Sequence, residues 1–360
     1  MIKNLHVVVG GQYGSEAKGH VTARLTKSAL QNRTSPQVLV VRVAGPNAGH
    51  TAYDINGVAH AFRQIPVGAV VGNVRTLIAA GSEIDIEVLL SEIQRCGRYD
   101  IPLRLAVDPN ATLIDDEHKA IEQGRFTGED LTTRLGSTAK GVGAARASRI
   151  MREARRLGDD LAAMSLLLSY GVDITPQEDV YEDGWDTVII EGTQGFGLGV
   201  HQPVYPFTTS SDCRSIDFLA MAGLSPWQAN RTTTWVVARV YPIRVAGNSG
   251  PLANETTWDE LGLPPEYTTV TKKMRRVGKE DWTLVARAVR ANGGDPGRVH
   301  SAAPVRVVIT MADQKWDDLA DLNQRNRLED HHWQWIDAIQ DQIGGYVAGI
   351  TTGPNTGVWL

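Results

Sequence analysis

The stretch LHVVVGGQYGSEAKGHVTARLTKSAL, residues 5–30, decides the fold. Its first part, 5–11, is a short apolar run that ends in two glycines, which predicts a buried strand. The segment 18–30 then has helical spacing, with Val21, Leu25 and Leu30 able to face inward. A strand that passes through a glycine-rich loop into a helix is typical of α/β proteins with a parallel sheet.

The same alternation of apolar strands and helices continues along the chain. Ser82 is expected to cap a helix that ends at Gly97. Further strands are predicted within 36–45, 74–85 (before a turn at Gly81), 103–109, 185–195, 232–245 and 304–313. The stretch 246–270 is turn-rich but too mixed to mark a boundary. We therefore expect a single domain over residues 1–360, with a large, mostly parallel central sheet flanked by helices and a P-loop-like first turn.

Composition excludes several classes of protein. The 36 lysines and arginines stand against 41 acidic residues, and the formal net charge of -5 argues against a general nucleic-acid binder. Cys96 and Cys213 are too few and too far apart for a disulfide scaffold, which favours a reducing compartment. A signal peptide and a long apolar run are both lacking, so we expect a cytoplasmic protein without membrane contact.

Polar clusters follow four of the predicted strands, at 10–20, 44–51, 191–199 and 310–316. Ligands in open α/β sheets bind at the carboxyl ends of strands, which makes these clusters candidate site segments. In the first, glycines let backbone N–H groups converge on a phosphate, and Lys18 adds a charge at the helix start. This is not a Walker A loop, because Ala17 precedes Lys18 and Gly19 follows it. Locally, the loop is either a phosphate site or only a tight turn.

Three other features keep two interpretations each on local grounds. His50 is either structural or an exposed proton donor or phosphate contact after a strand. The segment 270–279 has five cations, which form either a solvated surface or a clamp for anions. The hydroxyls of 208–212 serve either turns or a phosphate.

Taken in order, nine segments resemble the signature segments of adenylosuccinate synthetases across nearly the whole chain. They are GGQYGSEAKGH (10–20), NAGHT (47–51), GSTAKGVGA (136–144), EGTQG (191–195), YPFTTSSD (205–212), RVA (244–246), VTKKMRRVG (270–278), TMAD (310–313) and TTGPNT (351–356). The resemblance implies a ligase in which a nucleoside triphosphate with Mg²⁺ phosphorylates the 6-oxygen of a purine nucleotide. The amine of L-aspartate then displaces that phosphate at C6.

The resemblance also implies a role for each matching residue. The triphosphate would be bound by Gly14, Ser15, Glu16, Ala17, Lys18, Gly19, Gly49, His50 and Thr51, with Asp313, Gly353 and Pro354 at its base. The purine monophosphate would be bound by Ser15, Asn47, Ser137, Thr138, Arg152, Gln194, Thr209, Val245 and Ala246. Aspartate would be bound by Thr271, Lys273 and Arg275, and Mg²⁺ by Ser15 and the carbonyl of Gly49. The catalytic residues would be Ser15, His50 and Gln194.

A homodimer is implied as well, because the residue that matches Arg152 reaches over from the second subunit in that family. Arg149 is a neighbouring candidate for the same contact.

Ser15 is the main departure from the family pattern, which has a catalytic aspartate at this position. A serine is a poor base unless it is activated, so inactivity is one interpretation. The other is a changed substrate, because a shorter side chain leaves room for the 2-amino group of guanine. The phage branch of the family carries serine here and acts on dGMP, forming the precursor of 2-aminoadenine. The remaining alternative is an ordinary synthetase that uses IMP and GTP.

Two further departures agree with the phage branch. Met311 stands where a lysine reads guanine, which favours ATP or dATP over GTP. Lys273 replaces an arginine near the ribose, which favours a 2′-deoxy sugar because the two cations are not interchangeable. The acceptor of the N1 proton stays open. Ser15 would relay the proton to a phosphate oxygen or water, or Gln194 and Mg²⁺ would stabilise the 6-oxyanion enough for water to take it.

Overall fold

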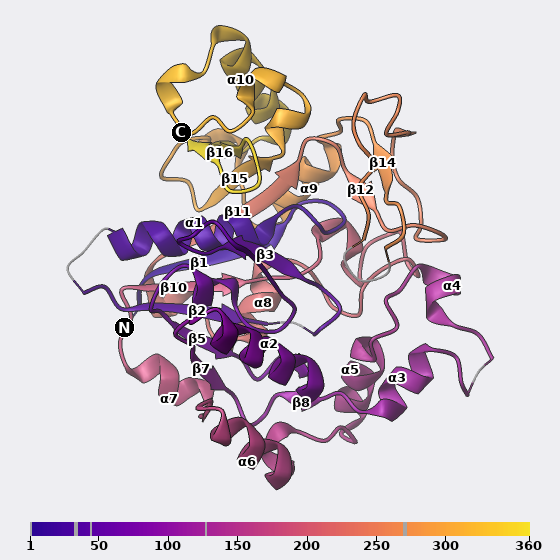
Figure 1. Ribbon diagram of the computed structural model, residues 1–360. Helices are drawn as coiled ribbons and strands as arrows, with labels where there is room; N and C mark the ends of the chain where they lie inside the picture. Colours follow the sequence, from indigo (N-terminus) through magenta and orange to yellow (C-terminus); the bar gives the residue numbers. More distant parts are fainter. Residues whose placement is uncertain (1, 32–34, 44, 127, 269–271) are drawn as a thin grey trace. The chain divides into compact units, whose positions relative to one another are not determined.

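The computed structural model describes residues 2–31, 35–43, 45–126, 128–268 and 272–360 (Figure 1). The chain divides into two compact units. The first comprises Met1–Val7, Thr22–Thr193 and Ile216–Thr232, and the second Val8–Val21, Gln194–Ser215 and Thr233–Leu360. The expectation of a single domain stays a prediction. Within these described ranges, the large sheet has ten strands and is mostly parallel, as expected from the sequence.

The first unit contains a run of parallel strands. In order across the sheet they are β10 (Thr187–Glu191), β2 (Val38–Arg42), β5 (Arg75–Ile78), β7 (Arg104–Val107) and β9 (Asp173–Ile174). Every residue of β10 and β2 is buried. These near-continuous apolar runs are typical of parallel strands covered on both faces.

Helices and short strand pairs make up the rest of the first unit. The helices are α2 (Ile86–Arg98), α3 (Asp116–Glu122), α4 (Leu131–Leu135), α5 (Val142–Met151), α6 (Leu161–Ser169) and α7 (Gln177–Glu182), and α8 (Ser215–Met221) begins at the last residue of a second-unit segment. The strand pairs are β3 (His50–Tyr53) with β4 (Ala59–Phe62), and β6 (Glu83–Ile84) with β8 (Thr112–Leu113).

The predicted cap of α2 is wrong. The helix begins at Ile86, and the side chain of Asp85 accepts a hydrogen bond from the backbone N–H of Val88. The Ser82 hydroxyl instead donates to the carbonyl of Arg42, 3.2 Å away. Residues 83–84 are taken up by strand β6, so the helix starts later than the local pattern suggested.

The second unit also has a parallel core. Strands β11 (Ala229–Arg239), β15 (Val305–Thr310) and β16 (Tyr346–Thr351) are parallel neighbours, and β17 (Gly357–Trp359) is antiparallel to β16. Helix α9 (Thr283–Ala291) packs against β15, and α10 (Asp330–Ile343) against β16. Among the described residues, no helix has the length and apolar character needed to span a membrane.

The predicted strand over 232–245 is in fact two strands. β11 ends at Arg239, and β12 (Ile243–Arg244) lies in a separate antiparallel sheet with β14 (Arg276–Gly278) and β13 (Glu255–Thr256). Pro242 separates the two strands and has no N–H to continue a ladder. The break sends the chain away from the main sheet. Strand β1 (Ile2–Gly10) and helix α1 (Lys18–Gln31) match their predicted segments to within a few residues.

Candidate functional site

The glycine-rich loop between β1 and α1 is organised around Glu16. This side chain is fully buried, and its Oε1 accepts hydrogen bonds from the backbone N–H groups of Gln12 (3.1 Å) and Gly14 (2.7 Å). Lys18, also buried, donates from Nζ to Oε2 of Glu16 at 2.7 Å. The buried ion pair therefore fixes the loop from inside, a role that sequence reasoning missed because it assigned Glu16 only to phosphate binding.

Ser15 has the opposite orientation to Glu16. It is exposed and has a φ of 60°, in the left-handed region, as has Ala17 at 61°. Within the described part of the chain, its hydroxyl makes no hydrogen bond. A strained conformation that turns one small polar side chain outward is a feature of ligand-binding loops. The Ser15 hydroxyl is accordingly available to a bound molecule.

Gln194 lies beside this loop in the same unit. A Cβ added to Gly10 would lie 2.5 Å from the carbonyl oxygen of Gln194, and one added to Gly195 would lie 2.4 Å from Oε1 of Glu16. Only glycine allows the two backbones to approach so closely. Gln194 itself has a φ of 58°. The structure thus brings two of the three predicted catalytic residues, Ser15 and Gln194, onto adjoining segments.

A chain of polar contacts connects the loop to the predicted aspartate segment. Gln12 and the backbone of Arg239 exchange two hydrogen bonds of 3.0 Å each, and Arg239 Nη1 donates to Glu266 at 3.1 Å. Burial alone would raise the pKa of Glu266, but the contact with Arg239 lowers it below its ordinary value. Burial lowers the pKa of Arg275, while the charge of Glu266 acts in the opposite direction.

The cationic segment 270–279 matches neither of its two interpretations as a whole. Thr271 lies outside the described residues, and Lys273 is exposed. Arg275 is partly buried next to Glu266, and Arg276 pairs with Glu255. One exposed and one inward-facing cation therefore remain as candidates for aspartate.

The residues assigned to the triphosphate base lie on η6 (Ala312–Gln314) and the segment after β16. One carboxylate oxygen of Asp313 is buried and has no hydrogen-bond partner among the described residues. Burial raises the pKa of this carboxyl, with a contribution from the charge of Asp321. The N–H of Met311 donates to Thr351 at 2.9 Å, which places the two segments side by side. An unpartnered acceptor here suits an N–H group of a nucleotide base.

His50 belongs to a buried cluster in the first unit, so its predicted exposure is wrong. It is the first residue of strand β3, and its Nδ1 contacts Oε1 of Glu191. The same oxygen accepts a hydrogen bond from Nη1 of Arg42. Oε2 of Glu191 accepts from the N–H of Val67 at 2.9 Å. Burial alone would raise the pKa of Glu191, but Arg42 and then His50 lower it below its ordinary value. Glu191 therefore orients the His50 ring through Nδ1.

Arg42 and Glu191 were not predicted as site residues. In the segment EGTQG only the glutamine was assigned a role, and Arg42 lies within a predicted apolar strand. A charged pair at the ends of two buried strands is the signal that would have found them, because β2 and β10 are neighbours and Arg42 pairs with Glu191 in register.

The remaining residues that were predicted to bind the monophosphate or the triphosphate belong to both units. In the first, Ser137 accepts from the N–H of Ala139 at 3.2 Å, and Glu122 accepts from the N–H groups of Gly141 and Gly143 at the start of α5, each at 2.7 Å. A carboxylate therefore already takes this helix terminus, where a phosphate would otherwise bind. The other predicted residues of the first unit are Asn47, Gly49, Thr51, Thr138 and Arg152, and those of the second unit are Thr209, Val245, Ala246, Gly353 and Pro354.

Comparisons with known proteins agree with the resemblance. The family model described as adenylosuccinate synthetase matches residues 7–170 and 172–296. The adenylosuccinate synthetase of Pyrococcus horikoshii is 32% identical over 351 residues, 97% of this chain and 95% of the relative. That of Methanococcus maripaludis strain C5 is 32% identical over 354 residues, 98% and 97% of the two chains.

Two solved structures share the fold. One is the succinoaminodeoxyadenylate synthetase of cyanophage S-2L, bound to dGMP and to dATP as an energy donor, with a TM-score of 0.77 and 28% identity, covering 98% of this chain and 94% of the other. The second is fully ligated adenylosuccinate synthetase from Plasmodium falciparum, with a TM-score of 0.76 and 19% identity, covering 99% of each chain. The second likeness bears on the fold alone.

Proposed function

Because the chain belongs to the adenylosuccinate synthetase family, ligases that join aspartate to a purine nucleotide, we propose that its substrate is dGMP. The reaction joins L-aspartate to C6 of dGMP with ATP or dATP as energy donor. The product is N6-succino-2-amino-2′-deoxyadenylate, a precursor of 2-aminoadenine DNA in a bacteriophage context. The single observation that carries this proposal is Ser15, a small exposed residue where the family has its catalytic aspartate.

Ser15 favours a 2-aminopurine for steric and electronic reasons. A carboxylate at this position would meet the edge of the base that bears N1 and C2, where guanine carries an additional amino group. The Ser15 hydroxyl is smaller, is uncharged and can accept a hydrogen bond from that amino group. The likeness to the phage synthetase bound to dGMP and dATP supports the same assignment.

The proposed reaction has two steps. The 6-oxygen of dGMP attacks the γ-phosphorus of the triphosphate as N1 loses its proton, which yields 6-phosphoryl-dGMP and the nucleoside diphosphate. The aspartate amine then attacks C6, loses a proton and expels inorganic phosphate. Lys18 would hold the γ-phosphate, and His50, oriented by Glu191, would stabilise the transferring phosphoryl group.

The N1 proton has two routes in this scheme, and Glu16 is on neither. Glu16 is fully buried, and its oxygens are engaged by two backbone N–H groups and Lys18. One route passes through the Ser15 hydroxyl to a phosphate oxygen or water, because serine alone is a poor base. In the other route, Gln194 stabilises the 6-oxyanion and water takes the proton directly.

Each group assigned to magnesium has the chemistry that this ion prefers. Mg²⁺ prefers oxygen ligands and keeps several waters and substrate phosphate oxygens, so it requires few protein groups. The exposed Ser15 hydroxyl and the carbonyl of the exposed Gly49 are such groups. When bound, the ion would neutralise charge on the phosphates.

ATP or dATP is the proposed donor because Met311 stands where a lysine reads guanine. An adenine amino group can donate to the Asp313 oxygen that has no partner in the described part of the chain. The dATP in the phage enzyme supports this choice.

A homodimer is proposed in which Arg152, or its neighbour Arg149, contacts the nucleotide bound to the other subunit. Arg152 is exposed at the end of α5, next to Ile150 and Met151, whose exposed fractions are 70% and 64%. Adjacent exposed apolar side chains favour an interface. Light scattering of the purified chain measures its molar mass in solution and so tests whether it is a dimer.

The second candidate function is an ordinary adenylosuccinate synthetase that acts on IMP with GTP. The observation in its favour is that the archaeal relatives of that name are 32% identical, against 28% for the phage enzyme. Release of inorganic phosphate separates the candidates when each monophosphate is supplied with aspartate and each triphosphate.

Ser15→Asp is expected to move the substrate preference from dGMP towards IMP. The carboxylate restores a base for N1 of hypoxanthine and crowds the 2-amino group, each effect being worth about tenfold or more. The kcat/KM ratio for the two substrates measures this, and dIMP is expected to be a poorer substrate of the native chain than dGMP. An unchanged ratio in the variant would show that Ser15 does not set the preference.

A further inference from the structure

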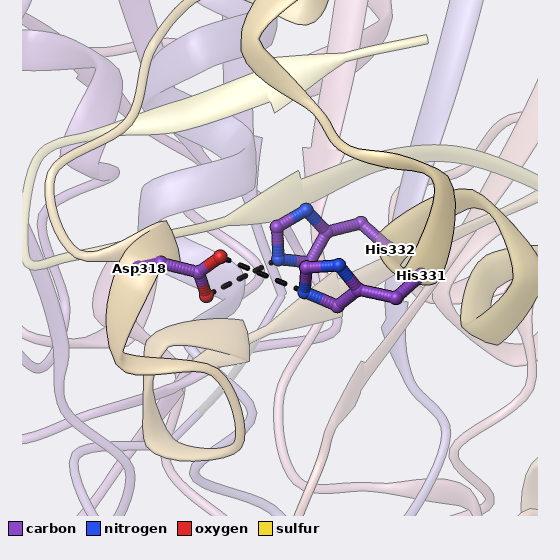
Figure 2. Close-up of side chains that lie close together, drawn as sticks. All are labelled: Asp318, His331 and His332. Carbon is purple, nitrogen blue, oxygen red and sulfur yellow. Dashed lines mark hydrogen bonds and ion pairs between the residues drawn. The ribbon is translucent and has the colours of Figure 1, made fainter.

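Two histidines and an aspartate of the second unit direct ligand atoms at one point (Figure 2). Asp318 lies on η7 (Asp317–Leu319), and His331 and His332 lie in the first turn of α10. One atom from each side chain lies within 4.8 Å of the others. Each histidine turns its Nε2 towards a different oxygen of the same carboxylate.

The separations are those of ligands around a small cation. Nε2 of His332 lies 3.3 Å from one oxygen of Asp318, and Nε2 of His331 lies 3.5 Å from the other. Charge-assisted hydrogen bonds between such groups are shorter, about 2.7–2.9 Å. A tetrahedral Zn²⁺ with bonds of about 2.0–2.1 Å places its ligands about 3.3 Å apart. One ion at this point would draw the three ligand atoms, which already lie within 4.8 Å of one another, into contact with it.

The charges around the rings also favour one divalent cation. The ring centroids of His331 and His332 are only 3.8 Å apart, and both rings face the Asp318 carboxylate. A carboxylate oxygen of Glu329 lies 3.6 Å from Nδ1 of His331. A carboxylate behind the second ring nitrogen is the common outer partner of a histidine that ligates a metal.

The contacts of His332 add one requirement. Its Nδ1 accepts a hydrogen bond of 3.1 Å from the N–H of Glu329, as part of the cap of α10. A histidine that binds through Nε2 normally carries its proton on Nδ1, so this capping contact would be exchanged for the metal bond. His332 is buried and fixed in place, whereas His331 and Asp318 are partly exposed and leave room for water as a fourth ligand.

We propose that Asp318, His331 and His332 form a binding site for one transition-metal dication of the zinc class. Two imidazole nitrogens and one carboxylate suit Zn²⁺ better than Mg²⁺, which prefers oxygen ligands. The ion would tie η7 to the start of α10. Trp316 contacts both histidine rings, at centroid distances of 4.8 and 5.9 Å, and its backbone N–H donates to the carbonyl of Ala312 in η6. The site would thereby brace the turn that carries Asp313.

Calorimetric titration of the metal-stripped full chain with ZnCl₂, in excess Mg²⁺, tests the site. The native chain is expected to bind one Zn²⁺ that Asp318→Asn and His331→Ala bind at least about tenfold more weakly. Both substitutions change partly exposed side chains, so the fold is expected to persist. His300→Ala, which removes an exposed histidine of the same unit, is the matched control and should bind as the native chain does.

A melting experiment gives a second readout. Zn²⁺ is expected to raise the melting temperature of the native chain and of His300→Ala, and not that of Asp318→Asn. Absence of Zn²⁺ binding by the native chain would overturn the proposal. Equal affinity in the native chain, Asp318→Asn and His331→Ala would overturn it too, because the ion would then bind elsewhere.

Discussion

Glu191→Gln is expected to lower the stability of the chain by about 3 kcal/mol and to slow ligation by about tenfold or more. Arg42 is buried and its Nη1 contacts this carboxylate, so neutralising Glu191 leaves a buried cation without its counter-charge. The same change replaces the charged acceptor of His50 Nδ1 with a neutral amide, whose NH2 group must face either this ring or the N–H of Val67. Urea unfolding and kcat measure the two effects.

The pH dependence of stability distinguishes the contribution of the Glu191 carboxylate from that of an exposed glutamate. Arg42 and His50 hold the pKa of Glu191 below its ordinary value of 4.5, although burial opposes them. Its contribution is therefore fully present above pH 4.5 and is lost as the pH falls through the lower value of the folded state. The native chain is expected to lose this contribution in acid, and the variant to lack it at every pH. Glu182→Gln, at an exposed position on α7, is the control. Equal effects of both substitutions would contradict the account.

Lys18→Met is expected to reduce kcat/KM by about 10²–10³-fold and stability by about 3 kcal/mol. The methionine keeps the length of the side chain but removes the charge assigned to the γ-phosphate. It also leaves Glu16 buried without the cation that lies 2.7 Å away. Lys27→Met changes an exposed lysine on the same helix and should leave both quantities nearly unchanged.

The double variant Lys18→Met with Glu16→Gln sharpens this prediction. Removing both charges of a buried pair is much less costly than removing one, so stability should largely return. Activity should not return, because the phosphate contact is still lost. Recovery of activity in the double variant would show that Lys18 acts only on Glu16.

The parallel sheet could be predicted because local sequence patterns determine it. The apolar run before Gly10 and the helical spacing after Lys18 are both visible within a few residues. The start of α2 and the end of β11 could not be predicted in the same way. They depend on the pairing of Glu83–Ile84 with Thr112–Leu113 and on a second small sheet, which are contacts between distant segments.

The candidate site divides in the same manner. The loop, His50 and Gln194 stand out by composition and by their resemblance to a known family. The surroundings of these side chains, in contrast, could not be predicted from the sequence. Glu16 sits in a glycine-rich loop that suggests solvent exposure, yet it is fully buried because two backbone N–H groups and Lys18 surround it. His50 is buried for a similar reason, since Arg42 and Glu191 from neighbouring strands close around it.

The most direct test of the dGMP assignment is phosphate release by the purified native chain with aspartate and Mg²⁺. Either dGMP or IMP is supplied, each with ATP, dATP or GTP as donor. The account predicts aspartate-dependent release with dGMP, supported by ATP or dATP, at a kcat/KM at least about tenfold above that for IMP. Turnover of IMP with GTP and none of dGMP with any donor would contradict it.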